Sequence, residues 1–271
     1  MKPAMMFQAT FKADPDDVLL ASSMKTGSTW LKALCFCIMQ GNKEEEDLLV
    51  KDNPHFHVPI IEAVNYFTNT PADPYTMSSP RLLHTHIPYS LLSDSIKNSD
   101  NYKIIYIARN PKDTLISMWH FFNYTSGYLE DPFPLEKAVE CFCNRVHPYG
   151  PFFEHVLEYW EESKKRPQKI LFLKYEDLKR DPKKEVAKIA SFLEKPFENE
   201  EDLEKVLWKC SFERLKNLEV NKSGSLFNNI PNSTFFRKGI VGDWKNHITH
   251  EMEEQLDKFT SLKLQGSGLV L

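Results

Sequence analysis

The sequence predicts an α/β fold in which a central parallel sheet is flanked by helices, formed by a single domain over residues 1–271. Two observations carry this prediction. Short runs rich in β-branched and aliphatic residues alternate with longer helical patterns, which is typical of a parallel sheet with helices on both faces. Each of these runs is followed by a polar or charged segment, and open α/β sheets bind their ligands at the carboxyl ends of their strands.

The predicted strands are residues 18–21, 81–84, 103–108 and 170–173. Helices are predicted over residues 30–40, 114–122, 135–145, 150–164, 182–192, 201–210 and 251–260. Asp181 is expected to be the N-cap of the helix that begins at Pro182. Two segments are expected to be loops: residues 69–80, which contain three prolines, and the polar segment 217–236. Long loops inside a compact domain tend to be lids or binding loops, so residues 217–236 are predicted to close over a ligand.

Composition limits the possible functions. With 41% hydrophobic residues in 271, the chain can bury a substantial core, and its net charge of −4 argues against a dedicated nucleic-acid binder. The five cysteines are an odd set, and neither Cys-Phe-Cys pair has the spacing of a zinc knuckle. We therefore expect free thiols in a reducing compartment. No apolar run approaches the roughly 18 residues of a membrane span, and residues 1–14 do not resemble a secretory signal. A cytoplasmic location without membrane contact is expected.

A short polar loop follows the first predicted strand. It reads Met-Lys-Thr-Gly-Ser-Thr-Trp from Met24 to Trp30 and leads directly into a helical pattern. A helix N-terminus presents unpaired N–H groups and a partial positive charge, so such a loop is a natural anion site. Gly27 allows close approach of the backbone, Lys25 adds charge, and hydroxyl donors are expected from Thr26, Ser28 and Thr29. We expect the loop to bind phosphate or sulfate, and the alternative is a solvated turn rich in Ser and Thr.

Trp30 has two interpretations, because its indole can stack on a base or can belong to the core of the helix. The loop also differs from the phosphate loop of ATP and GTP enzymes, which places two glycines before a Lys-Ser/Thr pair. Here Lys25 precedes the only glycine of the loop. An ATP-dependent kinase is therefore the least favoured of the functions that we consider.

Two further basic groups follow other predicted elements. Arg109 comes directly after the third strand, and the helix that follows carries Ser117. A guanidinium suits the bidentate recognition of phosphate, although an Arg at a strand end also commonly pairs with a surface carboxylate. Arg237, Lys238 and Gly239 end the long polar segment. Three separated basic sites indicate a ligand with more than one anionic end.

Three motifs, in this order, resemble those of the cytosolic sulfotransferases. They are Lys-Thr-Gly-Ser-Thr-Trp at 25–30, Tyr-Ile-Ala-Arg-Asn-Pro-Lys-Asp at 106–113 with a Ser eight positions beyond the Arg, and Arg-Lys-Gly-Ile-Val-Gly-Asp-Trp-Lys-Asn at 237–246. The sequences Lys-Tyr-Glu-Asp at 174–177 and Gly-Ser-Gly-Leu at 266–269 are most similar to the plant soluble branch, which includes flavonol and steroid types. The resemblance extends from about residue 17 to the last residue. It implies the P-loop-like sulfotransferase fold.

The resemblance also implies a co-substrate, 3′-phosphoadenosine 5′-phosphosulfate (PAPS), and no metal. The 5′-phosphosulfate would be held by Lys25, Thr26, Gly27, Ser28 and Thr29, with Trp30 against the adenine. The 3′-phosphate would be held by Arg109, Ser117, Arg237, Lys238 and Gly239, and the base site would be completed by Tyr175 and Phe212. A 3′-phosphate needs a second fixed site that an ATP enzyme lacks, which agrees with the separated basic groups.

The sequence Leu-His-Thr-His-Ile-Pro at 83–88 supplies the expected catalytic base. Residues two apart on a strand share a face, so His84 and His86 are expected to point the same way. The family pattern Lys-Thr-His implies that His86 is the base, and imidazole titrates near neutrality. Lys25 would neutralise the charge that builds on the bridging oxygen as the sulfuryl group leaves. Two other interpretations stay open: His-x-His is also a metal-ligand spacing, and two histidines can line a strand end without chemistry.

The chain departs from the family pattern at several positions. His84 stands where the family has Lys, which predicts weaker charge stabilisation beside the sulfuryl group. Met24 replaces a Pro and Ser28 a Thr, changes that are expected to alter the stiffness of the loop and preserve its shape. The leader, residues 1–16, is shorter than in the family, so the acceptor pocket is expected to be open or incomplete. His250 takes the position of a Val in the family's dimer motif. Because the motif is altered there, we expect a monomer.

The expected function is transfer of a sulfuryl group from PAPS to a hydroxyl of a small, largely apolar acceptor, such as a flavonoid, a steroid or another specialised metabolite. A second function from a different class is a protein that binds PAPS or its product 3′,5′-diphosphoadenosine (PAP) with little or no catalysis. The short leader and His84 are the reasons for considering it.

Overall fold

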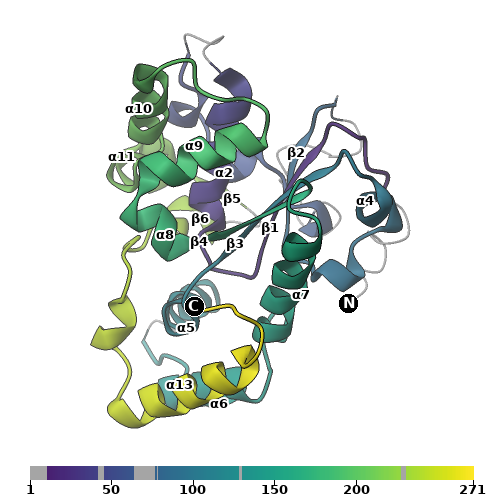
Figure 1. Cartoon of the computed structure of the whole chain (residues 1–271). Coiled ribbons are helices and arrows are strands. Elements are labelled where there is room, and N and C mark those ends of the chain that lie inside the picture. The colour runs from purple at the N-terminus through teal and green to yellow at the C-terminus, as the bar shows by residue number, and fades with distance from the viewer. Residues whose placement is uncertain (1–10, 42–45, 64–76, 78, 128–129, 227–229) are drawn as a thin grey trace.

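The computed structural model describes residues 11–41, 46–63, 77, 79–127, 130–226 and 230–271. Its centre is a parallel sheet of four strands, β1 (Val18–Ser22), β2 (Leu82–Thr85), β3 (Lys103–Ala108) and β4 (Ile170–Lys174) (Figure 1). The order is β2-β1-β3-β4, with β1 paired to β2 and β3 along its length. The predicted parallel sheet is confirmed, and each strand lies within one residue of its predicted position.

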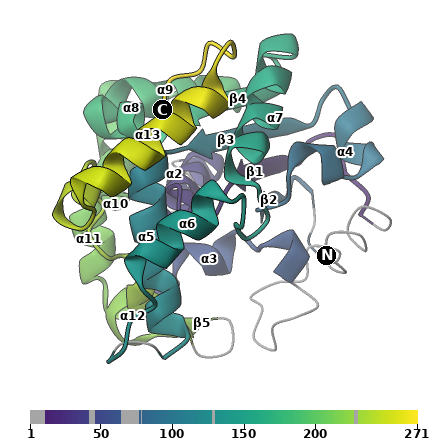
Figure 2. The same ribbon diagram turned by 90° about the horizontal axis from the view of Figure 1, so that it is seen from below.

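Helices cover both faces of this sheet. Side chains of β1 alternate between the two faces, because Val18 and Leu20 belong to one buried cluster while Leu19 and Ala21 belong to the other. The first cluster is completed by α2 (Ser28–Gln40), α8 (Tyr175–Arg180), α9 (Pro182–Phe192), α10 (Glu200–Lys209) and α11 (Phe212–Asn217), and α3 (Pro54–His57) packs against α2. The second is completed by α4 (Asp94–Asn98), α5 (Pro111–Thr125), α6 (Leu135–Cys143), α7 (Phe152–Lys165) and α13 (His250–Leu264). Figures 1 and 2 show α2 with α9 on one side of the sheet and α7 with α13 on the other.

Helix α9 begins where the sequence predicts. The side chain of Asp181 accepts a hydrogen bond from the backbone N–H of Lys184, and Pro182 occupies the first helical turn. The predicted N-cap is thus confirmed. Short 3-10 helices occur at Leu48–Val50, Ile61–Ala63, Tyr89–Leu91, Asn232–Phe235 and Asp243–Asn246. No helix in the described part of the chain combines the length and the apolar character that crossing a bilayer requires.

The prediction that residues 217–236 form one long loop is wrong. The segment contains α12 (Glu219–Ser223), the antiparallel strands β5 (Ser225–Leu226) and β6 (Ile230–Pro231), and a 3-10 turn. Its asparagines are the reason, because they hydrogen-bond internally instead of facing water. Asn221 Nδ2 donates to the carbonyl of Leu215 at 2.8 Å, and Asn232 Nδ2 donates to that of Val220 at 2.7 Å. The other predicted loop, residues 69–80, lies almost entirely outside the described residues.

Candidate active site

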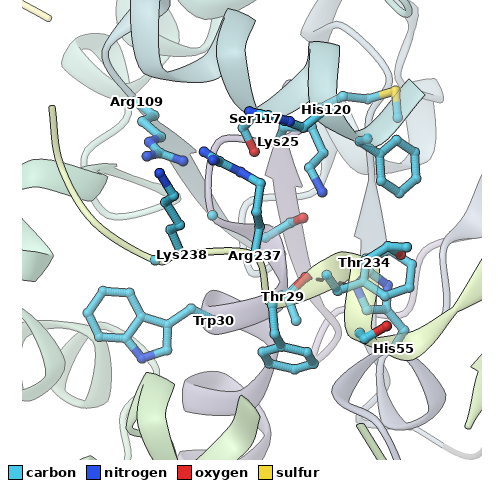
Figure 3. Close-up of a pocket in the computed structure, with 18 of the residues that line it drawn as sticks. Lys25, Thr29, Trp30, His55, Arg109, Ser117, His120, Thr234, Arg237 and Lys238 are labelled. Carbon is cyan, nitrogen blue, oxygen red and sulfur yellow. Dashed lines mark hydrogen bonds between the residues drawn. The ribbon is translucent and has the colours of Figure 1, made fainter. Parts of the chain in front are cut away.

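A cavity of about 480 Å³ lies at the carboxyl ends of the four strands. Each strand contributes a wall residue just beyond its end: Lys25 after β1, His86 after β2, Arg109 after β3 and Tyr175 after β4. Parallel strands all end at the same edge of the sheet, which is why segments far apart in sequence meet here. Figure 3 shows Lys25, Arg109, Arg237 and Lys238 close to one another, between Ser117 and Trp30.

The loop between β1 and α2 has a backbone that only a glycine fits at one position. Gly27 has φ 112°, in the left-handed region, and a Cβ there would lie 2.7 Å from Cδ2 of Tyr175. In the described chain, no side chain caps this end of α2. The first N–H groups of the helix are therefore available to a ligand on the cavity side.

Lys25 carries the loop's charge into a buried setting. Burial, together with the positive charges of the nearby Arg109 and Arg237, lowers the pKa of its ammonium to about 7. Its Nζ lies 4.3 Å from the centroid of the Phe121 ring and 5.7 Å from that of Phe235. Three cationic groups thus converge on one cavity, and an anion placed between them would favour the charged form of Lys25.

The two arginines retain donors that nothing in the described chain uses. Arg109 Nη2 donates to the carbonyl of Ile240 at 2.8 Å, and its guanidinium lies 4.5 Å from the ring centroid of Tyr175. The buried Nε atoms of Arg109 and Arg237 have no hydrogen-bond partner among the described residues. Buried donors are almost always satisfied in proteins, so these two N–H groups indicate a ligand that supplies the acceptors.

A buried carboxylate holds the second basic cluster in place. Asp243 accepts hydrogen bonds at 2.7 Å from both Arg237 and Lys238. Burial opposes the charged form of Asp243, but the hydrogen bonds from Lys238 and Arg237 outweigh it and hold the pKa of this carboxyl below its usual value. The following turn is tied to α5, because Asp113 accepts from the backbone N–H of Gly242 at 2.7 Å. Arg237 is thereby fixed beside Arg109 instead of moving with a free loop.

Aromatic side chains form the wall next to the basic cluster. Trp30 and Tyr175 are in edge-to-face contact, with ring centroids 5.8 Å apart. Gly239 has φ 63° and lies so close to the ring of Phe212 that a Cβ at this position would clash with it. Trp30 lines the cavity instead of facing the core alone. The arrangement suits a flat aromatic base bound beside the cations.

Of the two histidines at the end of β2, His86 is the one that lines the cavity. Its Nδ1 lies 2.8 Å from the carbonyl oxygen of Ser22, and a carbonyl only accepts, so Nδ1 carries the proton. The backbone N–H of His86 donates to the buried carboxylate of Glu62 at 2.6 Å, and its carbonyl accepts from His155 Nε2 at 2.9 Å. Burial lowers the pKa of His86 to about 3, although the Ser22 carbonyl acts in the opposite direction. His86 is therefore neutral, with Nε2 able to accept a proton.

His84 faces the same strand end but does not line the cavity. Its Nε2 lies 3.1 Å from Ser22 Oγ, and its ring centroid lies 4.5 Å from that of His86. Both imidazoles thus point toward Ser22, as the strand alternation predicts. Among the described residues no group of three His, Cys, Asp or Glu side chains is arranged to hold a metal ion.

The structure brings nearly all of the predicted site residues to this one cavity. The wall includes Lys25, Gly27, Ser28, Thr29, Trp30, His86, Arg109, Ser117, Tyr175, Phe212, Arg237, Lys238 and Gly239. Thr26 is the exception, because its buried hydroxyl lies 2.9 Å from the carbonyl oxygen of Ser23 and 3.0 Å from that of Ile107. Its side chain therefore stabilises the loop and is not available to a ligand.

Sequence reasoning missed several wall residues. His55 comes from α3, and Phe121, Tyr124, Tyr149 and Phe235 supply apolar surface. Asn53 caps α3 by accepting from the N–H of His55, and Pro54 occupies its first turn. An Asn-Pro pair is a helix-start signal, so α3 was detectable in the sequence. Nothing in the sequence pattern indicates that the aromatic residues share a wall.

Comparisons with known proteins agree with this geometry. The sequence model of the family described as "Sulfotransferase domain" matches residues 15–268. Cytosolic sulfotransferase 12 of Arabidopsis thaliana is 42% identical over 270 residues, which cover 98% of this chain and 82% of that protein. Cytosolic sulfotransferase 14 of the same plant is 43% identical over 275 residues, covering 97% of this chain and 79% of the relative.

Solved structures show the same relationship. A putative steroid sulphotransferase of Arabidopsis thaliana superposes with a TM-score of 0.75 at 33% identity, covering 99% of this chain and 83% of its own. The mouse sulfotransferase SULT7A1, solved in complex with PAP, has a TM-score of 0.75 at 27% identity, covering 98% of this chain and 90% of its own. The predicted sulfotransferase fold is confirmed. The chain belongs to the sulfotransferase family, among the plant cytosolic sulfotransferases.

Proposed function

We propose that this sulfotransferase moves a sulfuryl group from PAPS to a hydroxyl of a small, largely apolar acceptor. The observation that carries the proposal is the meeting of Lys25, Arg109 and Arg237 in one cavity, where both guanidinium Nε donors lack a partner in the described chain. A doubly anionic adenosine nucleotide would satisfy both clusters at once. The SULT7A1 complex with PAP supports this choice of nucleotide.

The roles of the residues follow from their positions. The α2 N-terminus, with Ser28 and Thr29, would hold the phosphosulfate, and Arg109, Ser117 and Arg237 would hold the 3′-phosphate. Backbone groups of Gly27 and Gly239 would approach the nucleotide, with Lys238 beside them, and its base would lie among Trp30, Tyr175 and Phe212. No step of this scheme calls for a metal.

The reaction would be an in-line displacement at sulfur. His86 Nε2 accepts the proton of the acceptor hydroxyl while that oxygen forms a bond to sulfur. The bond between sulfur and the bridging phosphate oxygen breaks, and the Lys25 ammonium stabilises the charge that develops on this oxygen. The products are a sulfate ester and PAP, with the proton on His86 released afterwards.

The acceptor side of the cavity supports an apolar substrate. Phe121, Tyr124, Tyr149, Ile230 and Phe235 line it, with His86 at its edge. A flat or ring-shaped hydroxylated metabolite, such as a flavonoid or a steroid, fits such a surface. The name of the Arabidopsis putative steroid sulphotransferase agrees with this class of acceptor.

We also propose that the enzyme acts as a single-domain monomer. His250, at the position where the family's dimer motif has an apolar residue, lies at an exposed helix start with its Nε2 3.2 Å from Glu254. A polar contact there stands in place of the apolar contact that a dimer would bury. Sedimentation of the purified protein tests this.

The experiment that tests the function is a transfer assay with labelled PAPS and a panel of phenols, flavonoids and steroids. We expect a sulfated product with at least one acceptor and one PAP formed per product. The second candidate, a PAP-binding protein with little catalysis, is favoured by His84, which contacts Ser22 and leaves no cation at that position. It predicts that PAP raises the melting temperature while no acceptor on the panel is sulfated.

A further inference from the structure

Three side chains form a hydrogen-bonded row behind the cavity wall. Thr29 Oγ1 lies 2.9 Å from His55 Nε2, and His55 Nδ1 lies 3.1 Å from Lys32 Nζ. Lys32 also donates to the carbonyl of Val58 at 2.9 Å. Thr29 and Lys32 are on the first turns of α2, and His55 reaches them from α3. Thr29 and His55 line the cavity (Figure 3), whereas Lys32 is fully buried.

The row has a fixed direction when Lys32 is charged. An ammonium has only donors, so His55 Nδ1 must accept from Lys32. A neutral imidazole then carries its proton on Nε2, which donates to Thr29 Oγ1. Burial keeps His55 neutral, since it lowers the pKa of this imidazole well below its usual value, and the charge of Lys32 acts in the same direction. The oxygen of Thr29 is therefore an acceptor toward His55, and its own proton points elsewhere.

At neutral pH a substantial fraction of the protein molecules carry Lys32 in its charged form, and this fraction rises as the pH falls. Burial lowers its pKa to about 7, and the carboxylate of Glu62 opposes that shift. A nearby anion in the cavity would favour the ammonium further. The row thus has its stated direction under the conditions in which an anionic nucleotide is bound.

We propose that Lys32 and His55 are positioning residues that direct the hydroxyl proton of Thr29 into the cavity, toward the 5′ end of the bound nucleotide. The inference rests on the proposed function, which places the phosphosulfate at the α2 N-terminus. A threonine hydroxyl without this row is free to present a lone pair to the anion, and that contact is repulsive. With the row in place, the hydroxyl donates a hydrogen bond to a charged acceptor.

A double-mutant cycle tests this direction. Lys32→Met keeps most of the buried stem and removes the donor, and Thr29→Val removes the hydroxyl at nearly constant volume. We expect Lys32→Met to weaken PAP binding by about five- to tenfold, measured by calorimetry in slightly acidic buffer. In the Thr29→Val background the same change is expected to alter the dissociation constant by less than about twofold. Equal weakening in both backgrounds, or none in the first, overturns the proposal.

Two replacements of His55 distinguish the effect of its hydrogen bond to Thr29 from the effect of its packing. Gln can place its amide N–H near the former Nε2 and keep the donation to Thr29, whereas Asn reaches only the former Nδ1 position. We expect His55→Gln to hold PAP within about twofold of the parent and His55→Asn to bind several-fold more weakly, at equal melting temperatures. Equal affinities of the two variants contradict the row. Failure of the unaltered protein to bind PAP would instead refute the proposed function.

Discussion

The Nδ1 atom of His86, a residue of the cavity wall, donates to the carbonyl oxygen of Ser22 across 2.8 Å, which leaves Nε2 as the ring nitrogen without a proton. This tautomer is set by the backbone at the end of β1, and the Glu62 carboxylate fixes the backbone of His86 from the other side. The imidazole that we propose as the base is therefore oriented before any substrate binds. Its role is separable from nucleotide binding, because the basic clusters lie on other elements.

We predict that His86→Gln lowers kcat at least about 100-fold, the usual contribution of a positioned general base. The dissociation constant of PAP is expected to stay within about twofold, because the variant keeps every cation of the cavity. Stopped transfer assays and calorimetry measure the two quantities. The exposed His250→Gln serves as the matched control and should leave both unchanged. Turnover by His86→Gln at the parent rate would remove His86 from the mechanism.

Lys25 makes nucleotide binding depend on pH. In the free protein its pKa is about 7, owing first to burial and then to Arg109 and Arg237. A bound anion raises that pKa, so binding takes up a proton above neutrality. The dissociation constant of PAP should rise with pH above about 7, by at most about tenfold per pH unit.

Lys25→Met should bind PAP more weakly at neutral pH and show a reduced pH slope. Lys188→Met is the matched control, since it removes the same charge from an exposed residue that does not line the cavity. Calorimetry in two buffers of different ionisation enthalpy reports the proton uptake directly. A slope that is the same in Lys25→Met and in the parent would show that another group takes up the proton.

Gly27 connects the conformation of the loop to the aromatic wall where we propose that the adenine binds. Gly27→Ala introduces a Cβ at φ 112° and 2.7 Å from Tyr175, so both the loop and the aromatic wall must shift. We expect a loss of about 1–3 kcal/mol in stability and at least tenfold in PAP affinity. Gly266→Ala is the control, because Gly266 also has a positive φ but has no atom within 4 Å of the Cβ position. Only the Gly27 variant should lose affinity; a matching loss in both would mean that strain alone is responsible.

Buried histidines predict acid instability. Burial lowers the pKa of His155 to about 4 and that of His86 to about 3, whereas both titrate near 6.5 in the unfolded chain. The unfolded state therefore binds more protons in this window, and the stability present above about pH 6.5 is lost as the pH falls toward these folded-state values. The part of this loss in the free energy of unfolding that is due to His155 alone is on the order of 2–3 kcal/mol. Urea unfolding at several pH values measures the effect, and a constant free energy of unfolding between pH 7 and 5 would contradict it.

The sequence predicts the sheet and the cationic end of the cavity well, because both depend on local patterns. Strand β3 and the loop around Gly27 have short, continuous signatures. The direction of the Thr26 hydroxyl could not be predicted from the sequence, because it depends on Ile107, a partner 81 positions away. Segment 217–236 was misread because polar asparagines suggest solvent, while Asn221 and Asn232 in fact satisfy buried carbonyls. The row behind Thr29 needs α3 to pack on α2, which no periodicity reveals.

The central claim is that one cavity binds both anionic ends of a 3′-phosphorylated adenosine nucleotide. Calorimetry with PAP and with AMP measures it most directly, because the two ligands differ only in the 3′-phosphate. We predict that PAP binds at least about tenfold more tightly than AMP, and that Arg237→Gln removes most of this preference. Equal affinity of the unaltered protein for PAP and AMP would contradict the account.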